Sequence, residues 1–110
     1  MAQQFAADTE LRVVDRDTVG RLWEAHKQED WPRLAASLEG PLMTLDTVIS
    51  GCVVYFLDSE EGLDDQRRTI VGDCLADLET IEEELEEDCR PYFQRLRELG
   101  ALLLIIPRKP

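Results

Sequence analysis

The stretch PLMTLDTVISGCVVYF, residues 41–56, decides the fold class, because two different structures fit it. Its apolar residues recur at spacings of three and four, which is typical of one face of an α-helix. Its β-branched and aromatic residues at 48–56 also suit a β-strand. The helical spacing persists for about four turns, so we expect a helix, although Gly51 weakens it by about 1 kcal/mol relative to alanine. The predicted buried face consists of Leu42, Leu45, Ile49, Cys52, Val53 and Phe56.

A helix is expected before this stretch, ending at about Gln28. Asp15 or Asp17 would cap it, because a short carboxylate accepts hydrogen bonds from the free amides of a first turn. The spacing of its apolar residues predicts one buried face. That face consists of Val19, Leu22, Trp23 and His26.

A second, short helix is expected within EDWPRLAASLEG, residues 29–40. Asp30 would be its cap and Pro32 would lie in its first turn, where a missing amide donor costs nothing. Gly40 would end it, because glycine is favoured just past the end of a helix.

The second half of the chain predicts a loop, DSEEGLDD at 58–65, followed by the longest helix. Asp64 or Asp65 would cap that helix, which continues to about Asp88. Pro91 then kinks or restarts the helical chain, because its ring excludes a hydrogen bond to the preceding turn. The predicted core face of the longest helix consists of Ile70, Cys74, Leu78, Ile81, Leu85 and Cys89, with Val71 and Leu75 alongside.

A last helix, carrying Tyr92, Phe93, Leu96 and Leu99, is expected to end at Gly100. The apolar run that follows it, residues 101–106, has the length of a strand. It could pair with the weakly alternating residues 10–14. We therefore predict a mainly α fold: a single acidic domain over residues 1–110, built as a bundle of four to five helices, with a short two-stranded pairing of residues 10–14 and 101–106.

The net charge of −12 is concentrated in one part of the sequence. Residues 69–89 contain nine acidic residues and no basic residue, whereas residues 90–110 carry five basic residues and one acidic residue. This balance disfavours direct binding to nucleic acid or to an anionic membrane surface and favours a basic protein partner. Three widely spaced cysteines argue against a disulfide scaffold and for a reduced, cytoplasmic setting. The longest uninterrupted apolar run, 101–106, is far shorter than the ~20 residues of a membrane span.

The acidic segment forms an almost continuous carboxylate surface about 22 Å long if it is helical. Five like-charged pairs then stand one turn apart, and each costs about 0.2–0.5 kcal/mol. A solvated helix face usually mixes charges, so this surface is a candidate for partner binding. An alternative is that Arg67, Arg68, Arg90, Arg95 and Arg97 neutralise it internally. The candidate partner-binding residues are Asp73, Asp77, Glu83, Glu84, Glu87 and Asp88.

Catalytic and metal chemistry find little support in the sequence. The acidic loop lacks glycine and glutamate at the positions that a calcium loop requires, and no Cys-x-x-Cys pair suggests zinc. Cys89 precedes the last helix, but three neighbouring carboxylates oppose its ionisation. Cys52 and Cys74 lie on apolar faces, as core cysteines do. We expect His26 to lie at the edge of the core. We expect no cofactor, no metal site and no enzymatic activity.

Two functional hypotheses remain. The leading one is a small acidic cytoplasmic binding protein that docks a basic surface on a macromolecular partner, either as an inhibitor or immunity-type protein or as a mimic of nucleic acid. The alternative is a structural helical homo-oligomer, or an accessory subunit, whose acidic face only gives solubility.

Overall fold

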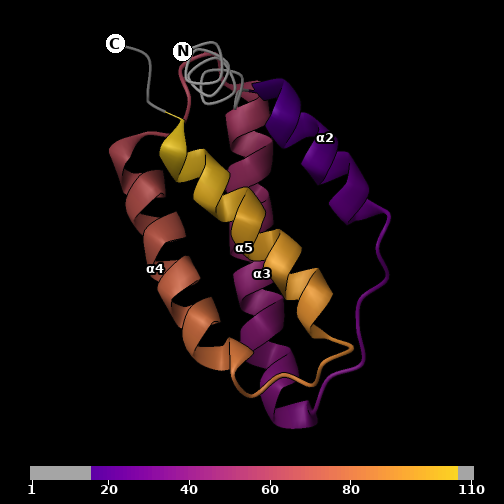
Figure 1. Ribbon diagram of the computed structural model, residues 1–110. Helices are drawn as coiled ribbons and strands as arrows, with labels where there is room; N and C mark the ends of the chain where they lie inside the picture. The colour runs from indigo at the N-terminus through magenta and orange to yellow at the C-terminus, as the bar shows by residue number, and fades with distance from the viewer. Residues whose placement is uncertain (1–15, 107–110) are drawn as a thin grey trace, which may run out of the picture.

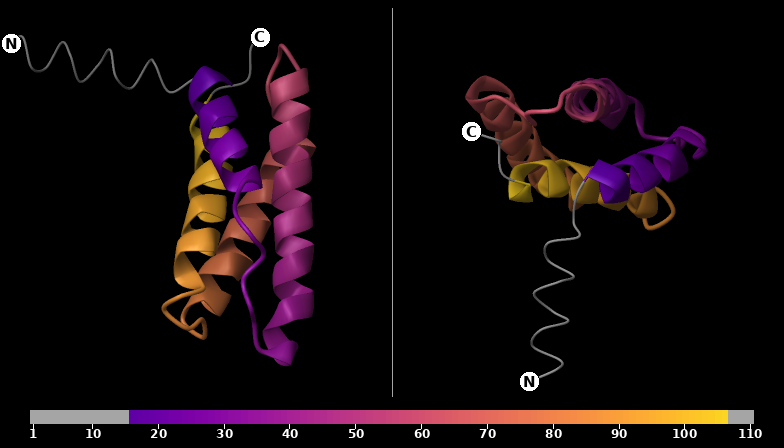
Figure 2. Two further views of the ribbon diagram at one scale, coloured as in Figure 1. Left: turned by 90° about the vertical axis from the view of Figure 1, so that its right-hand side faces the viewer. Right: turned by 90° about the horizontal axis from the view of Figure 1, so that it is seen from above.

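The computed structural model describes residues 16–106 and forms four α-helices in that part of the chain. They are α2 (Arg16–Lys27), α3 (Ala36–Asp58), α4 (Asp65–Glu82) and α5 (Arg90–Ile105) (Figure 1). Helices α3, α4 and α5 alternate in direction, and α2 packs against α3 and α5 (Figures 1 and 2). Residues 16–106 contain no β-strand. The prediction of a mainly helical bundle is therefore confirmed.

The helical prediction for residues 42–56 is also confirmed. All six residues of the predicted face are buried in the core, and Ile49 and Val53 are completely inaccessible to solvent. Burying a side chain of this size stabilises a fold by about 1.5–3 kcal/mol. Six such residues outweigh the cost of Gly51, so α3 extends without interruption from Ala36 to Asp58.

The short helix predicted for residues 30–40 is wrong. Residues 28–35 are not helical, and α3 begins at Ala36 and passes through both Gly40 and Pro41. Pro41 lies in the second turn of α3, and its missing amide would otherwise bond to the carbonyl of Ser37, an exposed residue that water can reach. The non-helical segment is instead held by Trp31, which partly buries its ring against the core.

Helix α2 agrees with its prediction in extent and in its buried face. Val19 and His26 are buried, while Leu22 and Trp23 are partly buried against the core. Asp17 lies in the first turn and is not the cap, because the helix already begins at Arg16. Asp15, the other predicted cap, lies outside the described residues.

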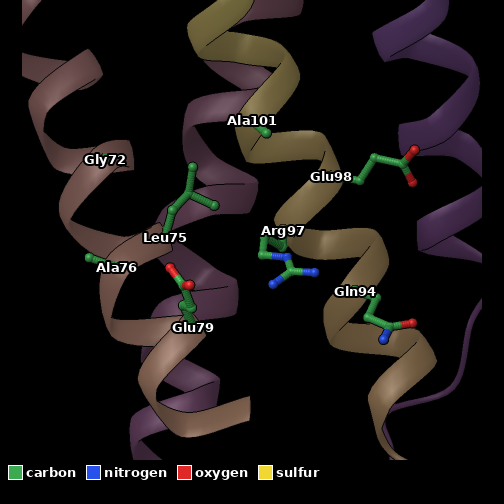
Figure 3. Close-up of a pocket in the computed structure, with 8 residues that line it drawn as sticks. All are labelled: Gly72, Leu75, Ala76, Glu79, Gln94, Arg97, Glu98 and Ala101. Atoms are coloured by element: carbon green, nitrogen blue, oxygen red, sulfur yellow. The ribbon is translucent and has the colours of Figure 1, made fainter. Parts of the chain in front are cut away.

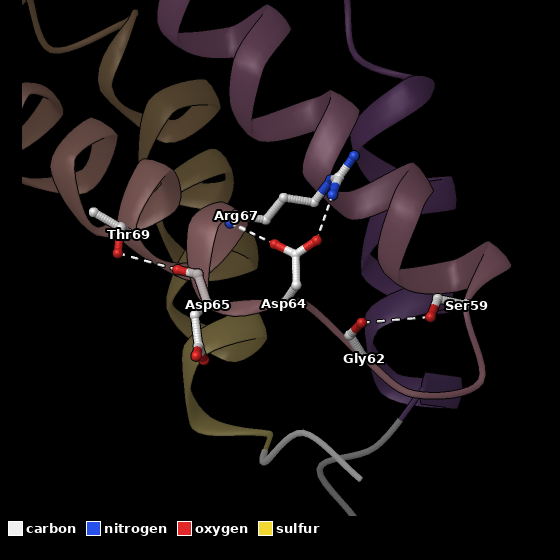
Figure 4. A network of polar contacts seen from close by, with 6 residues as sticks. All are labelled: Ser59, Gly62, Asp64, Asp65, Arg67 and Thr69. Carbon is white, nitrogen blue, oxygen red and sulfur yellow. Dashed lines mark hydrogen bonds and ion pairs between the residues drawn. The ribbon is translucent and has the colours of Figure 1, made fainter. Parts of the chain in front are cut away.

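The connection between α3 and α4 ends in a side-chain cap (Figure 4). Asp64 accepts a hydrogen bond of 2.8 Å from the backbone amide of Arg67 and forms an ion pair with the guanidinium of the same residue. Gly62 has a φ of 87°, a left-handed conformation that glycine adopts without strain. The predicted loop is confirmed, and so is Asp64 as the cap of α4.

Helix α4 ends earlier than predicted. It stops at Glu82, and the chain makes turns over residues 83–89 instead of continuing as a helix to Asp88. A helix reaching Asp88 would gather carboxylates at a C-terminal end that already carries partial negative charge. It would also set like charges one turn apart. Ending at Glu82 avoids both costs, so α3, with 23 residues, is longer than α4, with 18.

The predicted core face of α4 is partly correct. Val71, Cys74 and Leu78 are buried, whereas Ile70 is 36% exposed. Leu85 and Cys89 are also buried, although they belong to the connection and not to the helix. The apolar spacing therefore identified buried residues beyond the end of the helix itself.

Helix α5 extends past Gly100 to Ile105, so the predicted stop at Gly100 and the predicted strand at 101–106 are both wrong. Residues 10–14, the other half of the predicted pairing, lie outside the described residues. A Cβ atom at position 100 would lie 2.9 Å from Cδ2 of Leu75, so this glycine serves the close approach of α4 and α5. The helix ends where the Arg68 guanidinium donates hydrogen bonds to the carbonyls of Leu103, Leu104 and Ile106, at 3.5, 2.7 and 3.3 Å.

Candidate partner-binding surface

The six residues predicted to bind a partner are all exposed, but they do not share one helix. Asp73 and Asp77 lie one turn apart on α4. The other four lie in the connection between α4 and α5, which spans residues 83–89. The predicted continuous stripe along one helix is therefore wrong, and only one of the five predicted like-charged pairs, Asp73 with Asp77, has both members within α4. We call these six residues the acidic surface: Asp73, Asp77, Glu83, Glu84, Glu87 and Asp88.

The connection that carries most of these carboxylates is fixed to the core at two points. The side chains of Leu85 and Cys89 are buried, with exposed fractions of 4% and 5%. The Arg90 side chain donates a hydrogen bond of 3.1 Å from Nε to the Leu85 carbonyl, and the Cys89 thiol donates one of 3.1 Å to the carbonyl of Arg33. Since the apolar side chains point inward, the acidic side chains between them are held toward solvent.

The arginines of α5 do not neutralise the acidic surface. Arg97 pairs with Glu82 at 2.9 Å, and Arg95 pairs across the bundle with Glu29 at 2.9 Å. Arg90 is bonded to a backbone carbonyl. The two arginines of α4 are also engaged elsewhere: Arg67 pairs with Asp64, and Arg68 caps the end of α5.

No residue of the acidic surface therefore forms an ion pair with any of the residues 16–106. The alternative of internal neutralisation holds for Glu82, which lies next to the surface, and not for the surface itself.

Two of the acidic residues have a structural explanation that the sequence did not reveal. Glu87 and Asp88 directly precede α5, which begins at Arg90. The N-terminal end of a helix carries partial positive charge, so carboxylates there stabilise it. In a helix that continued to Asp88 they would lie at its unfavourable C-terminal end, and the early stop of α4 places them before α5 instead. Asp73, Asp77, Glu83 and Glu84 have no comparable role.

A shallow groove of about 720 Å³ lies between α4 and α5, beside the acidic surface (Figure 3). Small residues form its floor on α4, and Arg97 and Glu79 extend into it from opposite helices (Figure 3). A smaller hollow of about 270 Å³ is lined by Glu83 together with Glu79, Glu82, Arg90 and Gln94. Glu83 thus lies near α5, whereas Asp73 and Asp77 lie on α4 outside both hollows.

The cysteines are poorly placed for nucleophilic chemistry. All three are buried as free thiols. Burial raises the pKa of each thiol, and the Asp88 carboxylate, 3.7 Å away, raises the pKa of Cys89 further. The predicted opposition to Cys89 ionisation is thus supported by the geometry, with desolvation as the larger cause.

A polar cluster at the junction of α2, α3 and α5 was missed by sequence reasoning. His26 is 4% exposed, and its Nε2 lies 3.3 Å from Oδ1 of Asp46. The ring of Tyr92 lies 4.6 Å from that of His26. Burial raises the pKa of the Tyr92 hydroxyl above its ordinary range, and the charge of Asp46 and a hydrogen bond to it raise that pKa further. The cluster joins three helices through one carboxylate, a role that the isolated spacing of His26 could not indicate.

No group of three or more histidine, cysteine or acidic side chains between Arg16 and Ile106 is arranged to hold a metal ion. Helix α3 is long and apolar enough to cross a membrane by length and composition, yet it packs along the core of the bundle through its buried face. The chain matches no protein-family model, no curated protein and no solved structure.

Proposed function

We propose that this protein is a small acidic binding protein of the cytoplasm that docks a basic surface on a macromolecular partner. The observation that carries the proposal is that the acidic surface is exposed and forms no ion pair with any of the residues from Arg16 to Ile106, while nearby arginines are bonded elsewhere. An anionic surface attracts a cationic partner over a distance of about one Debye length, ~8 Å at physiological salt. Such attraction accelerates association and selects partners by charge.

Two kinds of partner fit this surface. One is a basic toxin or nuclease that the protein inhibits, as an immunity-type protein does. The other is a protein with a phosphate-binding groove, which the carboxylates would occupy as a mimic of nucleic acid. Both kinds present clustered lysine and arginine, so the chemistry of recognition is the same. The proposal is of a binding protein, and the buried thiols with their raised pKa values give no support to cysteine-based catalysis.

The alternative is that the acidic residues contribute only to the stability and solubility of the folded chain. Glu87 and Asp88 favour this alternative, because they lie just before the N-terminus of α5. The test therefore removes only the four carboxylates without such a role. It compares wild type with a variant carrying Asp73→Asn, Asp77→Asn, Glu83→Gln and Glu84→Gln. The matched control removes four exposed carboxylates outside the acidic surface, by Asp30→Asn, Glu39→Gln, Glu60→Gln and Glu61→Gln.

Each protein is immobilised, exposed to native lysate at low salt and washed with increasing salt. Wild type and control should retain the same protein and release it as salt rises, while the acidic-surface variant should not retain it. Equal retention by all three proteins would contradict the proposal and leave the acidic surface as a solubility feature.

A further inference from the structure

The outer face of α3 carries no charged residue from Gly40 to Val54, although 33% of the whole chain is charged. In the view from above, α3 lies at one edge of the bundle, and the other helices leave its outer side uncovered (Figure 2). Met43 and Val54 are 47% and 42% exposed there, the largest apolar side chains on this face. The remaining exposed positions between residues 40 and 54 are Gly40, Pro41, Thr44, Thr47 and Gly51, with Ser50 half-buried. All of them except Pro41 are glycines or carry a hydroxyl.

No packing contact within residues 16–106 requires the two glycines on this face. A Cβ atom at position 40 or 51 would meet nothing within 4 Å, and both residues have ordinary helical backbone. Glycine in the middle of a helix lowers its stability. Gly100 is the contrasting case, since Leu75 packs directly against it. The presence of glycine at positions 40 and 51 would be explained if the backbone of another chain packed closely against the outer face of α3.

We propose that this face is the interface of a homodimer in which two α3 helices pack antiparallel about a two-fold axis at Thr47. Such an interface must be self-complementary, because the same surface is used twice. With Thr47 at the centre, Met43 lies at the level of Gly51 of the second copy, and Val54 lies at the level of Gly40. Each large side chain of one copy thus lies level with a glycine of the other.

Charge selects a second copy as the occupant. Two chains of net charge −12 repel each other, and this face is where they can meet without bringing charged side chains together. In the same register, Asp58 at the end of one α3 reaches the level of Ala36, the first residue of the other. A carboxylate is stabilised at the N-terminus of a helix. A basic partner would gain nothing from an uncharged face.

The expected dimer is weak and reversible. The contact from residue 40 to residue 54 is about 21 Å long. One helix face of this length falls at the small end of specific interfaces, which bury about 800 Å² per partner at standard size. The dimer would therefore form as concentration rises. It does not depend on the proposed function, because the acidic surface lies on other elements.

The first experiment measures sedimentation velocity of the full chain over a wide range of concentrations. Wild type should shift from monomer to dimer, and Gly51→Glu should raise the dissociation constant by at least about tenfold, which is ~1.4 kcal/mol. Gly72→Glu is the matched control: it adds the same charge at a helical glycine with open space around it, but on α4. It should leave the dimer intact. Circular dichroism should show both variants folded, since glutamate favours helix more than glycine does.

The second experiment tests the register by oxidative cross-linking of single added cysteines. Thr47→Cys should form a disulfide-linked dimer faster than Thr44→Cys, which lies off the axis, and faster than Thr80→Cys, which is exposed on α4. A chain that stays monomeric at every concentration would overturn the proposal, as would equal effects of Gly51→Glu and Gly72→Glu. Cross-linking at Thr47 no faster than at Thr80 would overturn it as well.

Discussion

Helices α3 and α4 carry the same kind of apolar periodicity, yet only α3 extends as far as its periodicity does. The predicted face of α3 is helical and buried from Leu42 to Phe56. The predicted face of α4 extended to Cys89, but the helix ends at Glu82. The charges differ: α3 contains three charged residues in 23, whereas residues 82–88 contain six carboxylates in seven. Apolar spacing thus identifies which residues are buried, and charge near the end of a helix affects where the helix stops.

The largest expected effect comes from truncating equivalent positions on the two predicted faces. Ile49→Ala should lower the free energy of unfolding by about 2–5 kcal/mol, because it leaves a cavity in the core. Ile70→Ala should cost less than about 1 kcal/mol, because Ile70 is 36% exposed. Urea unfolding monitored by circular dichroism gives both values. Equal losses of stability would mean that Ile70 is buried, as the apolar spacing predicts, and not partly exposed as in the structure.

The next effect concerns the thiol that α4 places in the core. Cys74→Ser should lower the free energy of unfolding by about 1–3 kcal/mol, because a hydroxyl is buried without an assured partner. The native thiols of Cys52, Cys74 and Cys89 should react slowly with a thiol reagent and rapidly after denaturation, since all three are buried. Rapid labelling of a native thiol, followed by mass spectrometry to locate it, would show that the helix carrying it is not packed as described.

These thiols also predict how stability depends on pH. Burial raises their pKa values in the folded protein, so they stay protonated at a pH where unfolded thiols, with an ordinary pKa of about 8.5, lose their protons. The unfolded state then binds fewer protons than the folded state, and the free energy of unfolding falls as pH rises. Their contribution should be complete below about pH 8 and decline above about pH 9. Urea unfolding at a series of pH values, repeated with Cys74→Ala, should show a shallower decline in the variant; an identical decline would contradict this assignment.

A smaller effect is expected at the end of α5. Arg68→Met should lower the free energy of unfolding by about 1–2 kcal/mol, because two carbonyls of α5 and the carbonyl of Ile106 just after it lose a charged donor. Arg21→Met is the control, since Arg21 is exposed on α2. The comparison is made by thermal unfolding of both variants. If the control lost as much stability, the cap on α5 would contribute nothing specific.

The smallest expected effect is a difference in stability between removing a carboxylate from α4 and removing one from the connection that precedes α5. Asp88→Asn should cost about 0.3–1 kcal/mol, because it removes a charge next to the N-terminus of α5. Asp77→Asn should gain about 0.2–0.5 kcal/mol at low salt, because it relieves repulsion from Asp73 one turn away. Both differences should shrink in high salt, and chemical unfolding at two salt concentrations measures them. A loss of stability in Asp77→Asn would indicate a structural role for that carboxylate.

Much of the fold could be predicted from the sequence, because apolar spacing reports local periodicity. The burial of Leu42, Ile49, Phe56 and Leu85 follows from it. The cap at Asp64, one of the two predicted candidates, follows from the capping preference of a short carboxylate. One error arises where the decisive contact is distant in sequence. The sequence predicts a stop at Gly100, because its contact with Leu75 is not visible in the sequence.

The candidate site was predictable as a set of exposed residues and not as an arrangement. A long helix would have aligned the six carboxylates in stripes, whereas the early end of α4 divides them between a helix and a connection. The ion pairs of Arg95 with Glu29 and of Arg97 with Glu82 join residues distant in sequence, so spacing could not assign them. With these arginines engaged elsewhere, no residue of the acidic surface forms an ion pair within residues 16–106.

The central claim is that the carboxylates of Asp73, Asp77, Glu83 and Glu84 serve a partner. The most direct test measures the association rate of the protein with the partner retained from lysate, as a function of salt concentration. We predict a rate for wild type that falls steeply as salt rises, because electrostatic attraction is screened, and a slower, nearly salt-independent rate for the variant lacking these four charges. The same rate and the same salt dependence in both proteins would contradict the claim.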